Sequence, residues 1–168
     1  MRIRVSESGI ELPDGRTVPC ALGRGGIQGD KREGDGVTPA GVWPIRRVLY
    51  RADRLARPRT KLPVGTIARQ DGWCDAPEDA AYNQPVTLPY SASHEEMWRE
   101  DGLYDLVAIL GYNDDPPEPG RGSAIFLHVA RPDYGPTEGC VALALPDLLM
   151  LLEQIAPDSA LHIGAGAE

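Results

Sequence analysis

The segment Ser123-Ala124-Ile125-Phe126-Leu127-His128 is an apolar run that ends in a histidine, and Thr137-Glu138-Gly139-Cys140-Val141 follows it along the chain. A short, continuous apolar run is typical of a strand buried on both faces. Cys140 comes twelve residues after His128 and directly after a glycine. The thiolate is the nucleophilic form of cysteine, so a nearby imidazole must accept the thiol proton at neutral pH. The two segments predict a central strand that brings a nucleophile and its base together.

The glycine before the cysteine has a second use. Without a side chain, Gly139 lets the N–H groups of Gly139 and Cys140 approach an oxyanion that develops on a substrate carbonyl. The alternative is that Cys140 is a small buried apolar residue, which is the commoner role of a free cysteine. One cysteine and one histidine do not decide between these interpretations.

Composition favours a mainly β protein. The 168 residues include 19 Gly and 16 Pro, above average usage, which favours turns and short strands over long helices. The length predicts one domain covering residues 1–168. The fold class expected is a mainly β single domain with two or three short helices.

Hydrophobic patterning locates the expected elements. We expect strands at residues 2–6, 10–12, 17–22, 42–50, 62–69, 104–111, 123–130 and 161–164. The best helix is 146–155, where proline suits the first turn and Asp147 complements the helix dipole. A capping-box pattern, Ser93 with Glu96, predicts a second helix that ends near residue 100, and residues 52–57 are expected to form one helical turn. Residues 23–41 and 71–91 are predicted to be long ordered loops.

Charge is distributed unevenly along the chain. Residues 1–70 carry 14 basic and 7 acidic side chains, and residues 71–168 carry 3 and 18, which leaves a net charge of −8. An acidic chain repels phosphate backbones, so no nucleic-acid partner is expected. The arginine-rich stretch 46–61 is expected either to bind a carboxylate-rich ligand, or to pair with the acidic half or simply be solvated.

The cysteines, the glycine motifs and the apolar segments limit which metal-binding, cofactor-binding and membrane classes are possible. Cys20, Cys74 and Cys140 lack zinc-site spacing, so either all are free or Cys20 and Cys74 form a disulfide. No phosphate-binding or dinucleotide-binding glycine motif is present, and we predict no cofactor and no metal. The longest apolar stretch, 148–152, is too short to cross a membrane. The first residues do not resemble a signal peptide, which predicts a cytoplasmic protein unless a leader has been removed.

Two segments resemble the YkuD-type L,D-transpeptidase family. The first is Gly34-Asp35-Gly36-Val37-Thr38-Pro39-Ala40-Gly41-Val42-Trp43-Pro44-Ile45. The second is His128 followed by Thr137-x-Gly139-Cys140, which is similar to the family's His…(Ser/Thr)-x-Gly-Cys signature. The resemblance covers about residues 18–165. It implies a mainly β catalytic domain built around curved sheets or a sandwich and located in the periplasm or the cell wall.

The resemblance also implies a reaction. Family enzymes transfer acyl groups between peptidoglycan stem peptides: a cysteine attacks the diaminopimelate carbonyl of a tetrapeptide, releases D-alanine and forms a thioester. An amine of a second stem, a D-amino acid or water then takes the acyl group. Carbapenems inhibit the family because the same thiolate opens the lactam.

By this resemblance each site residue has an expected role. Cys140 is the nucleophile, His128 is its base, and the N–H groups of Gly139 and Cys140 form the oxyanion hole. The hydroxyl or carbonyl of Thr137 orients His128. Three further residues are expected to line the substrate cleft, or else to serve in packing and turns: Tyr112, Asn113 and Tyr134.

The sequence departs from the family pattern at three positions. Val129 follows the histidine where glycine is common, Glu138 replaces a second histidine, and Ala142 stands where an arginine is common. A cation from the stretch 46–59 is expected to substitute for that arginine. These departures keep two alternatives open: an L,D-carboxypeptidase or amidase acting on D-amino-acid-containing peptides, and a non-catalytic domain that binds cell-wall fragments.

Overall fold

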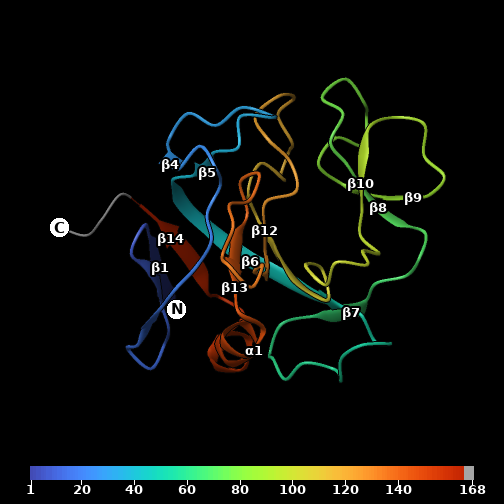
Figure 1. The fold of residues 1–168 in the computed structure, drawn as a ribbon. Coiled ribbons are helices and arrows are strands. Elements are labelled where there is room, and N and C mark those ends of the chain that lie inside the picture. The colour runs from blue at the N-terminus through green and yellow to red at the C-terminus, as the bar shows by residue number, and fades with distance from the viewer. Residues whose placement is uncertain (165–168) are drawn as a thin grey trace.

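A nine-stranded sheet forms the main body of the computed structural model, which describes residues 1–164 (Figure 1). The strand order is β13-β12-β11-β6-β14-β1-β2-β3, with β7 paired to β6. The strands are β1 (Arg2–Ser6), β2 (Gly9–Glu11), β3 (Thr17–Val18), β6 (Gly41–Tyr50), β7 (Val64–Thr66), β11 (Leu106–Leu110), β12 (Phe126–Val129), β13 (Val141–Leu143) and β14 (Ala160–Ile163). Strand residues make up 34% of the described residues and helix residues 6%, which confirms the mainly β prediction.

Strand β6 joins the two halves of this sheet. Its residues 41–44 pair with β14, and its residues 45–50 pair with β11. The expected strand 42–50 is therefore present. The expected strand 123–130 is shortened to β12, which lies between β11 and β13 with Phe126 and Leu127 fully buried. That burial on both faces explains its continuous apolar sequence.

Helix α1 (Leu145–Gln154) is the only helix within residues 1–164. It begins with a proline in its first turn, carries Asp147 there, and buries Leu148, Leu151 and Leu152 against the main core. The helix expected at 146–155 is thus confirmed, but the prediction of two or three helices is wrong. Residues 52–57 form turns, and the segment with the capping-box pattern contains the strand β10 (His94–Glu96).

The segment 71–91, expected to be a loop, contributes two strands to a separate small sheet. Strand β8 (Asp71–Cys74) lies between β9 (Pro85–Thr87) and β10 and pairs antiparallel with both. We call residues 71–99 the small-sheet lobe; Figure 1 shows its strands beside the main sheet. Trp73 docks this lobe by packing edge-on against Phe126, with ring centroids 5.0 Å apart.

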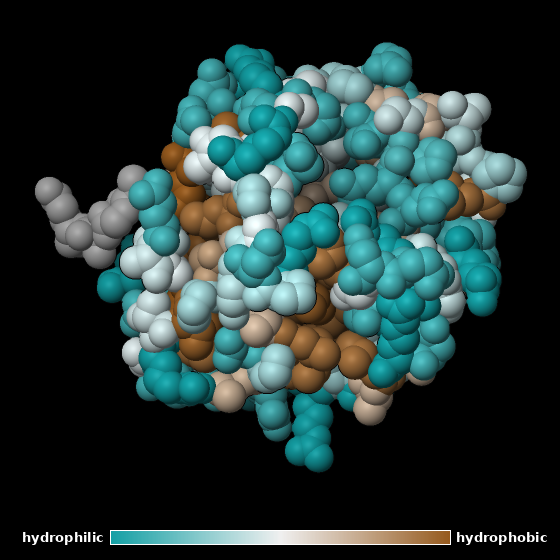
Figure 2. Space-filling model, viewed as in Figure 1, coloured by the Kyte–Doolittle hydropathy of each residue, from teal (hydrophilic) through white to brown (hydrophobic). Residues whose placement is uncertain are grey.

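The glycine-rich segment 23–41 also contains two strands. Strand β4 (Ile27–Gln28) pairs in parallel with β5 (Thr38–Pro39). Figure 2 shows a largely hydrophilic face in which hydrophobic residues are confined to small patches. Within the described chain, no helix is long and apolar enough to cross a membrane.

Candidate active site

The parallel pairing of β12 with β13 brings His128 and Cys140 to the same face of the sheet. Leu127 is opposite Val141, and His128 is opposite Ala142. Because side chains alternate along a strand, Cys140, two residues before Ala142, shares the face of His128. Both side chains line one cavity of about 330 Å³. The structure thus unites the two residues that the sequence singled out.

Cys140 is held as a buried thiol. Its Sγ donates a hydrogen bond to the carbonyl of Ala124 at 3.2 Å and accepts one from the N–H of Phe126 at 3.4 Å. Burial, together with the charge of Glu95, raises the pKa of Cys140 to about 12. The resting form of Cys140 at neutral pH is therefore the thiol, so an imidazole must accept its proton during the reaction.

His128 is held as a neutral base. Its Nδ1 lies 2.9 Å from the carbonyl oxygen of Val129, and its ring packs edge-on against Tyr104 with centroids 5.3 Å apart. Burial lowers the pKa of His128 to about 4. A proton on Nδ1 satisfies that carbonyl, which leaves the lone pair of Nε2 free to accept a proton. A neutral thiol and a neutral imidazole in the same cavity suit general-base catalysis, in which the proton moves as the sulfur attacks.

These two pKa values predict how the alkylation rate of the Cys140 thiol changes with pH. We expect alkylation of Cys140 by iodoacetamide to rise about tenfold per pH unit between about pH 8 and 11, because the thiolate fraction rises that way below a pKa of about 12. No inflection is expected between about pH 5 and 8, since His128 stays neutral there. The check is peptide mass spectrometry of the alkylated protein. A rate plateau below pH 8 contradicts the prediction and indicates a thiolate–imidazolium pair.

The turn before Cys140 is fixed by Thr137. Its Oγ1 donates to the carbonyl of Cys140 at 2.7 Å and accepts the N–H of Gly139 at 3.1 Å. The carbonyl of Thr137 accepts the N–H of Arg24. Thr137 therefore shapes the turn, and the expectation that it orients His128 is not met. The N–H of Gly139, expected in an oxyanion hole, is occupied in this structure.

The three expected cleft residues have other contacts and lie outside the lining of the cavity. Tyr112 packs edge-on against Trp43 at a centroid distance of 4.9 Å. Asn113 adopts a positive φ of 48° and bonds through its side chain to the backbone of Glu118, so it shapes a turn. Tyr134 has a φ of 54° and lies in the turn before Gly135. These are the packing and turn roles that we had kept as alternatives.

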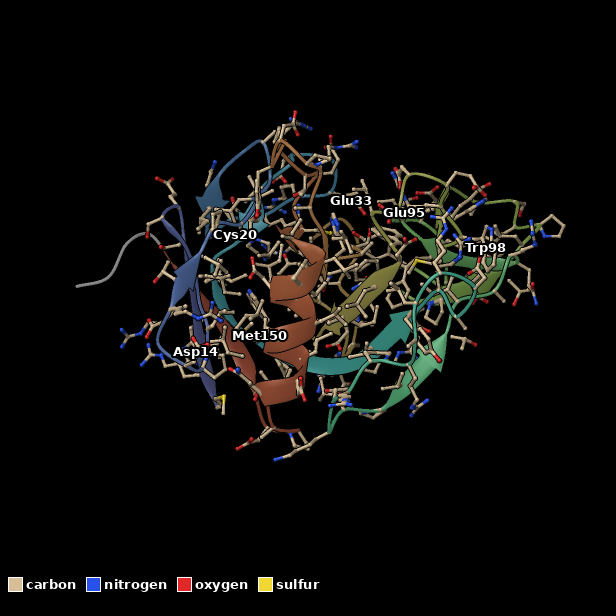
Figure 3. The ribbon with its side chains drawn as sticks, turned by 60° about the horizontal axis from the view of Figure 1, so that its bottom comes forward. Asp14, Cys20, Glu33, Glu95, Trp98 and Met150 are labelled. Atoms are coloured by element: carbon tan, nitrogen blue, oxygen red, sulfur yellow. The ribbon has the colours of Figure 1, made fainter. Side chains whose placement is uncertain are left out.

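Sequence analysis missed the acidic wall of the cavity, formed by Glu33, Asp75 and Glu95. Figure 3 labels Glu33 and Glu95, which come from the loop before β5 and from the small-sheet lobe. Glu95 accepts the Tyr104 hydroxyl at 2.7 Å. Asp75 Oδ1 is buried without a hydrogen-bond partner in the described part of the chain. None of the three carboxylates has a cation within ion-pair distance among residues 1–164, although Arg99 and Arg131 also line the cavity and burial raises the pKa of Glu95.

The arginine-rich stretch does not supply this cavity with a cation. Arg46 pairs with Asp114 at 3.0 Å, and Arg54 pairs with Asp105 at 2.9 Å. These partners belong to the acidic half of the chain, as one of our two interpretations predicted. The expectation that this stretch replaces the family arginine missing at Ala142 is wrong.

The structure also shows the state of the three cysteines. Cys20, Cys74 and Cys140 are all free, so the alternative with a Cys20–Cys74 disulfide is wrong. Within residues 1–164, no group of three His, Cys, Asp or Glu side chains is placed to hold a metal ion.

Neutralising one wall carboxylate tests its effect on the thiol. We expect Glu95→Gln to speed alkylation of Cys140 by roughly threefold to tenfold at a fixed pH between 8 and 10, because a nearby negative charge disfavours a thiolate. Glu96→Gln is the matched control, since Glu96 is an exposed residue next to it on β10. Equal rates in the two variants would show that the charge of Glu95 does not act on Cys140.

Comparison with known proteins agrees with this geometry. The family model of the L,D-transpeptidase catalytic domain, YkuD, matches residues 3–163, nearly the whole chain. No curated protein and no solved structure gives a significant match. The chain therefore belongs to the YkuD family of L,D-transpeptidase catalytic domains.

Proposed function

We propose that this protein transfers acyl groups between peptidoglycan stem peptides through a thioester on Cys140, acting in the periplasm or the cell wall. The observation that carries the proposal is the meeting of Cys140 and His128 in one cavity of a YkuD-family domain. Tyr104 supports it further, because its ring packs against His128 while its hydroxyl bonds to Glu95.

The first half-reaction begins at the Cys140 thiol. Its S–H turns from the carbonyl of Ala124 toward Nε2 of His128, which takes the proton while Sγ bonds to the substrate carbonyl carbon. The π electrons of the carbonyl move to its oxygen and form a tetrahedral oxyanion. Collapse of this adduct breaks the C–N bond, and His128 returns the proton to the departing amine of D-alanine. A thioester remains on Cys140.

The second half-reaction uses the same base. An incoming amine attacks the thioester carbon and gives its proton to His128, and the sulfur then leaves and recovers that proton as the thiol. Transfer to an amine gives a cross-link or an exchanged D-amino acid, whereas transfer to water gives a carboxypeptidase product. Which of them prevails depends on how well the bound peptides exclude water. A carbapenem, whose strained lactam carbonyl accepts the same attack, is the expected covalent inhibitor.

The acidic wall supports a substrate that carries a protonated amine. Diaminopimelate retains a second amino group when it is built into a stem peptide, and an ammonium ion suits carboxylates that lack a cation. Glu33 and Glu95 face the same cavity as Cys140, so an ammonium bound there lies within reach of the thiol. Its charge would also offset that of Glu95, which opposes the thiolate.

The direct test is to incubate the protein with purified tetrapeptide muropeptides, with and without a free D-amino acid, and to analyse the products by mass spectrometry. Cross-linked dimers or D-amino-acid exchange establish transpeptidation. Tripeptide alone means an L,D-carboxypeptidase that uses the same thioester. Unchanged muropeptides, with a folded protein, overturn peptidoglycan as the substrate and leave the amidase and cell-wall-binding alternatives.

A further inference from the structure

Lys31 is a buried cation that lies against the turn carrying Cys140. Its side chain is only 2% exposed. Its Nζ lies 3.3 Å from the point where a Cβ on Gly139 would be, and its Cε lies 2.7 Å from the equivalent point on Gly122. The absence of side chains at these two glycines leaves the space that the lysine occupies. The ammonium group therefore faces the backbone of Gly139, one residue before the nucleophile.

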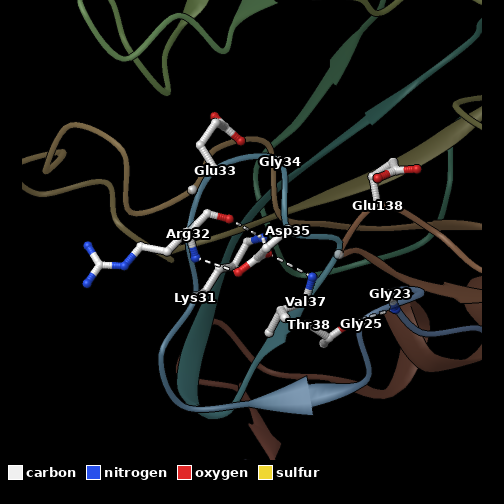
Figure 4. Close-up of polar contacts among 12 residues, drawn as sticks. Gly23, Gly25, Lys31, Arg32, Glu33, Gly34, Asp35, Val37, Thr38 and Glu138 are labelled. Carbon is white, nitrogen blue, oxygen red and sulfur yellow. Dashed lines mark hydrogen bonds and ion pairs between the residues drawn. The ribbon is translucent and has the colours of Figure 1, made fainter.

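A single carboxylate holds Lys31 in this position. Asp35 Oδ1 accepts from Lys31 Nζ at 3.0 Å, and the Asp35 carboxylate also accepts the backbone N–H groups of Arg32 and Val37 (Figure 4). The carbonyl oxygen of Val37 would lie 2.7 Å from a Cβ on Gly139. The loop 31–37 and the turn before Cys140 are thus packed backbone to backbone, with the ammonium group at their junction.

Three charged groups act on Cys140 from different elements. Glu95, on β10, raises the pKa of the thiol, whereas Lys31 and Arg99 lower it. Arg99 is bound by the carboxylate of Asp101 and lies over the ring of Tyr104, 5.0 Å from its centroid. Lys31 approaches Cys140 from a different side, where its ammonium group lies next to the backbone of Gly139.

We propose that Lys31 is a positioning residue for the chemistry of Cys140, its ammonium group stabilising negative charge on the Cys140 sulfur and on the substrate oxyanion. The stabilisation of the substrate oxyanion rests on the proposed function, whereas the stabilisation of the Cys140 thiolate does not. Ala142 leaves no arginine two residues after the nucleophile, and Lys31 brings a buried positive charge to the other side of the same turn. A cation fixed before the reaction stabilises developing charge without reorganisation.

The test compares two variants of one ion pair. Lys31→Met removes the charge and keeps most of the length of the side chain, so it should slow alkylation of Cys140 by roughly threefold to tenfold at a fixed pH between 8 and 10. Asp35→Asn removes the counter-charge and keeps the lysine, so it should speed the same reaction. Cys20, which does not line the cavity, is the internal control and should react equally in all samples.

Opposite directions in the two variants support the proposal. A purely structural ion pair predicts the same direction in both, because either change loosens the loop, and that result overturns the proposal, as does an unchanged rate. If Lys31→Met fails to fold, Asp35→Asn decides alone: acceleration supports the proposal, and an equal or slower rate refutes it. The iodoacetamide readout needs no peptidoglycan, so it stays informative if the muropeptide test fails. With muropeptides as substrate, Lys31→Met should lower kcat more than it raises KM.

Discussion

Replacing Cys140 by alanine should abolish turnover of tetrapeptide muropeptides, with a loss of at least about 10⁴-fold in kcat, as is typical when a covalent nucleophile is removed. Without the sulfur no thioester can form, and His128 has no proton to accept. The protein should also lose the mass increase expected of a covalent carbapenem adduct. Mass spectrometry of the intact protein and of its muropeptide products measures both effects.

Two further variants separate chemistry from folding. Cys140→Ser keeps a donor for the carbonyl of Ala124 and an acceptor for the N–H of Phe126, so its fold should match the native protein while its activity falls. Cys20→Ala removes another free, half-buried cysteine outside the cavity and should retain activity. Turnover by folded Cys140→Ala protein would rule out the thioester route.

The sequence predicted the central strand of the site because its signal is local, whereas its partner β13 was not predicted. An apolar run ending in His128 indicates a buried strand, and Gly139 indicates a backbone without a side chain directly before Cys140. Both signals depend on neighbours in the chain, and the structure contains both features. Helix α1 was predicted for the same reason, since its proline, Asp147 and leucine spacing all lie within its own ten residues.

The sequence did not predict the small-sheet lobe, because its strands depend on distant partners. The Ser93–Glu96 pattern favours a helix start, but pairing of His94 with Cys74 turns this segment into β10. That pairing brings Glu95 to the cavity wall. Asp75, next to β8, reaches the same wall from a segment that we had interpreted as a loop. Lys31 was missed likewise, because only the packing of its loop on the Gly139 turn reveals that it is buried.

Substituting Gly139 by alanine should strongly reduce both stability and activity, even though only one methyl group is added. Gly139 has a φ of +138°, which L side chains rarely adopt, and its Cβ would lie 2.7 Å from the carbonyl oxygen of Val37. The Cβ is fixed to the backbone of residue 139 and the Val37 oxygen is itself a backbone atom, so no side-chain rotation can relieve the contact and the backbone must move. The strained φ alone costs about 1–3 kcal/mol, and a displacement of the turn near 1 Å lowers activity by about 10²-fold.

Gly15→Ala is the matched control for the strain. Gly15 also has a positive φ, +87°, but nothing lies within 4 Å of its would-be Cβ. It should lose about 1 kcal/mol of stability from the left-handed backbone and keep full activity, because its hairpin lies outside the cavity. Denaturant unfolding and muropeptide turnover, measured on both variants, separate the effect of backbone strain on stability from the effect of the displaced turn on activity. A Gly139→Ala protein as active as Gly15→Ala would mean that the turn tolerates displacement. In that case the close packing of the loop 31–37 on this turn, on which the role of Lys31 depends, would not be needed for catalysis.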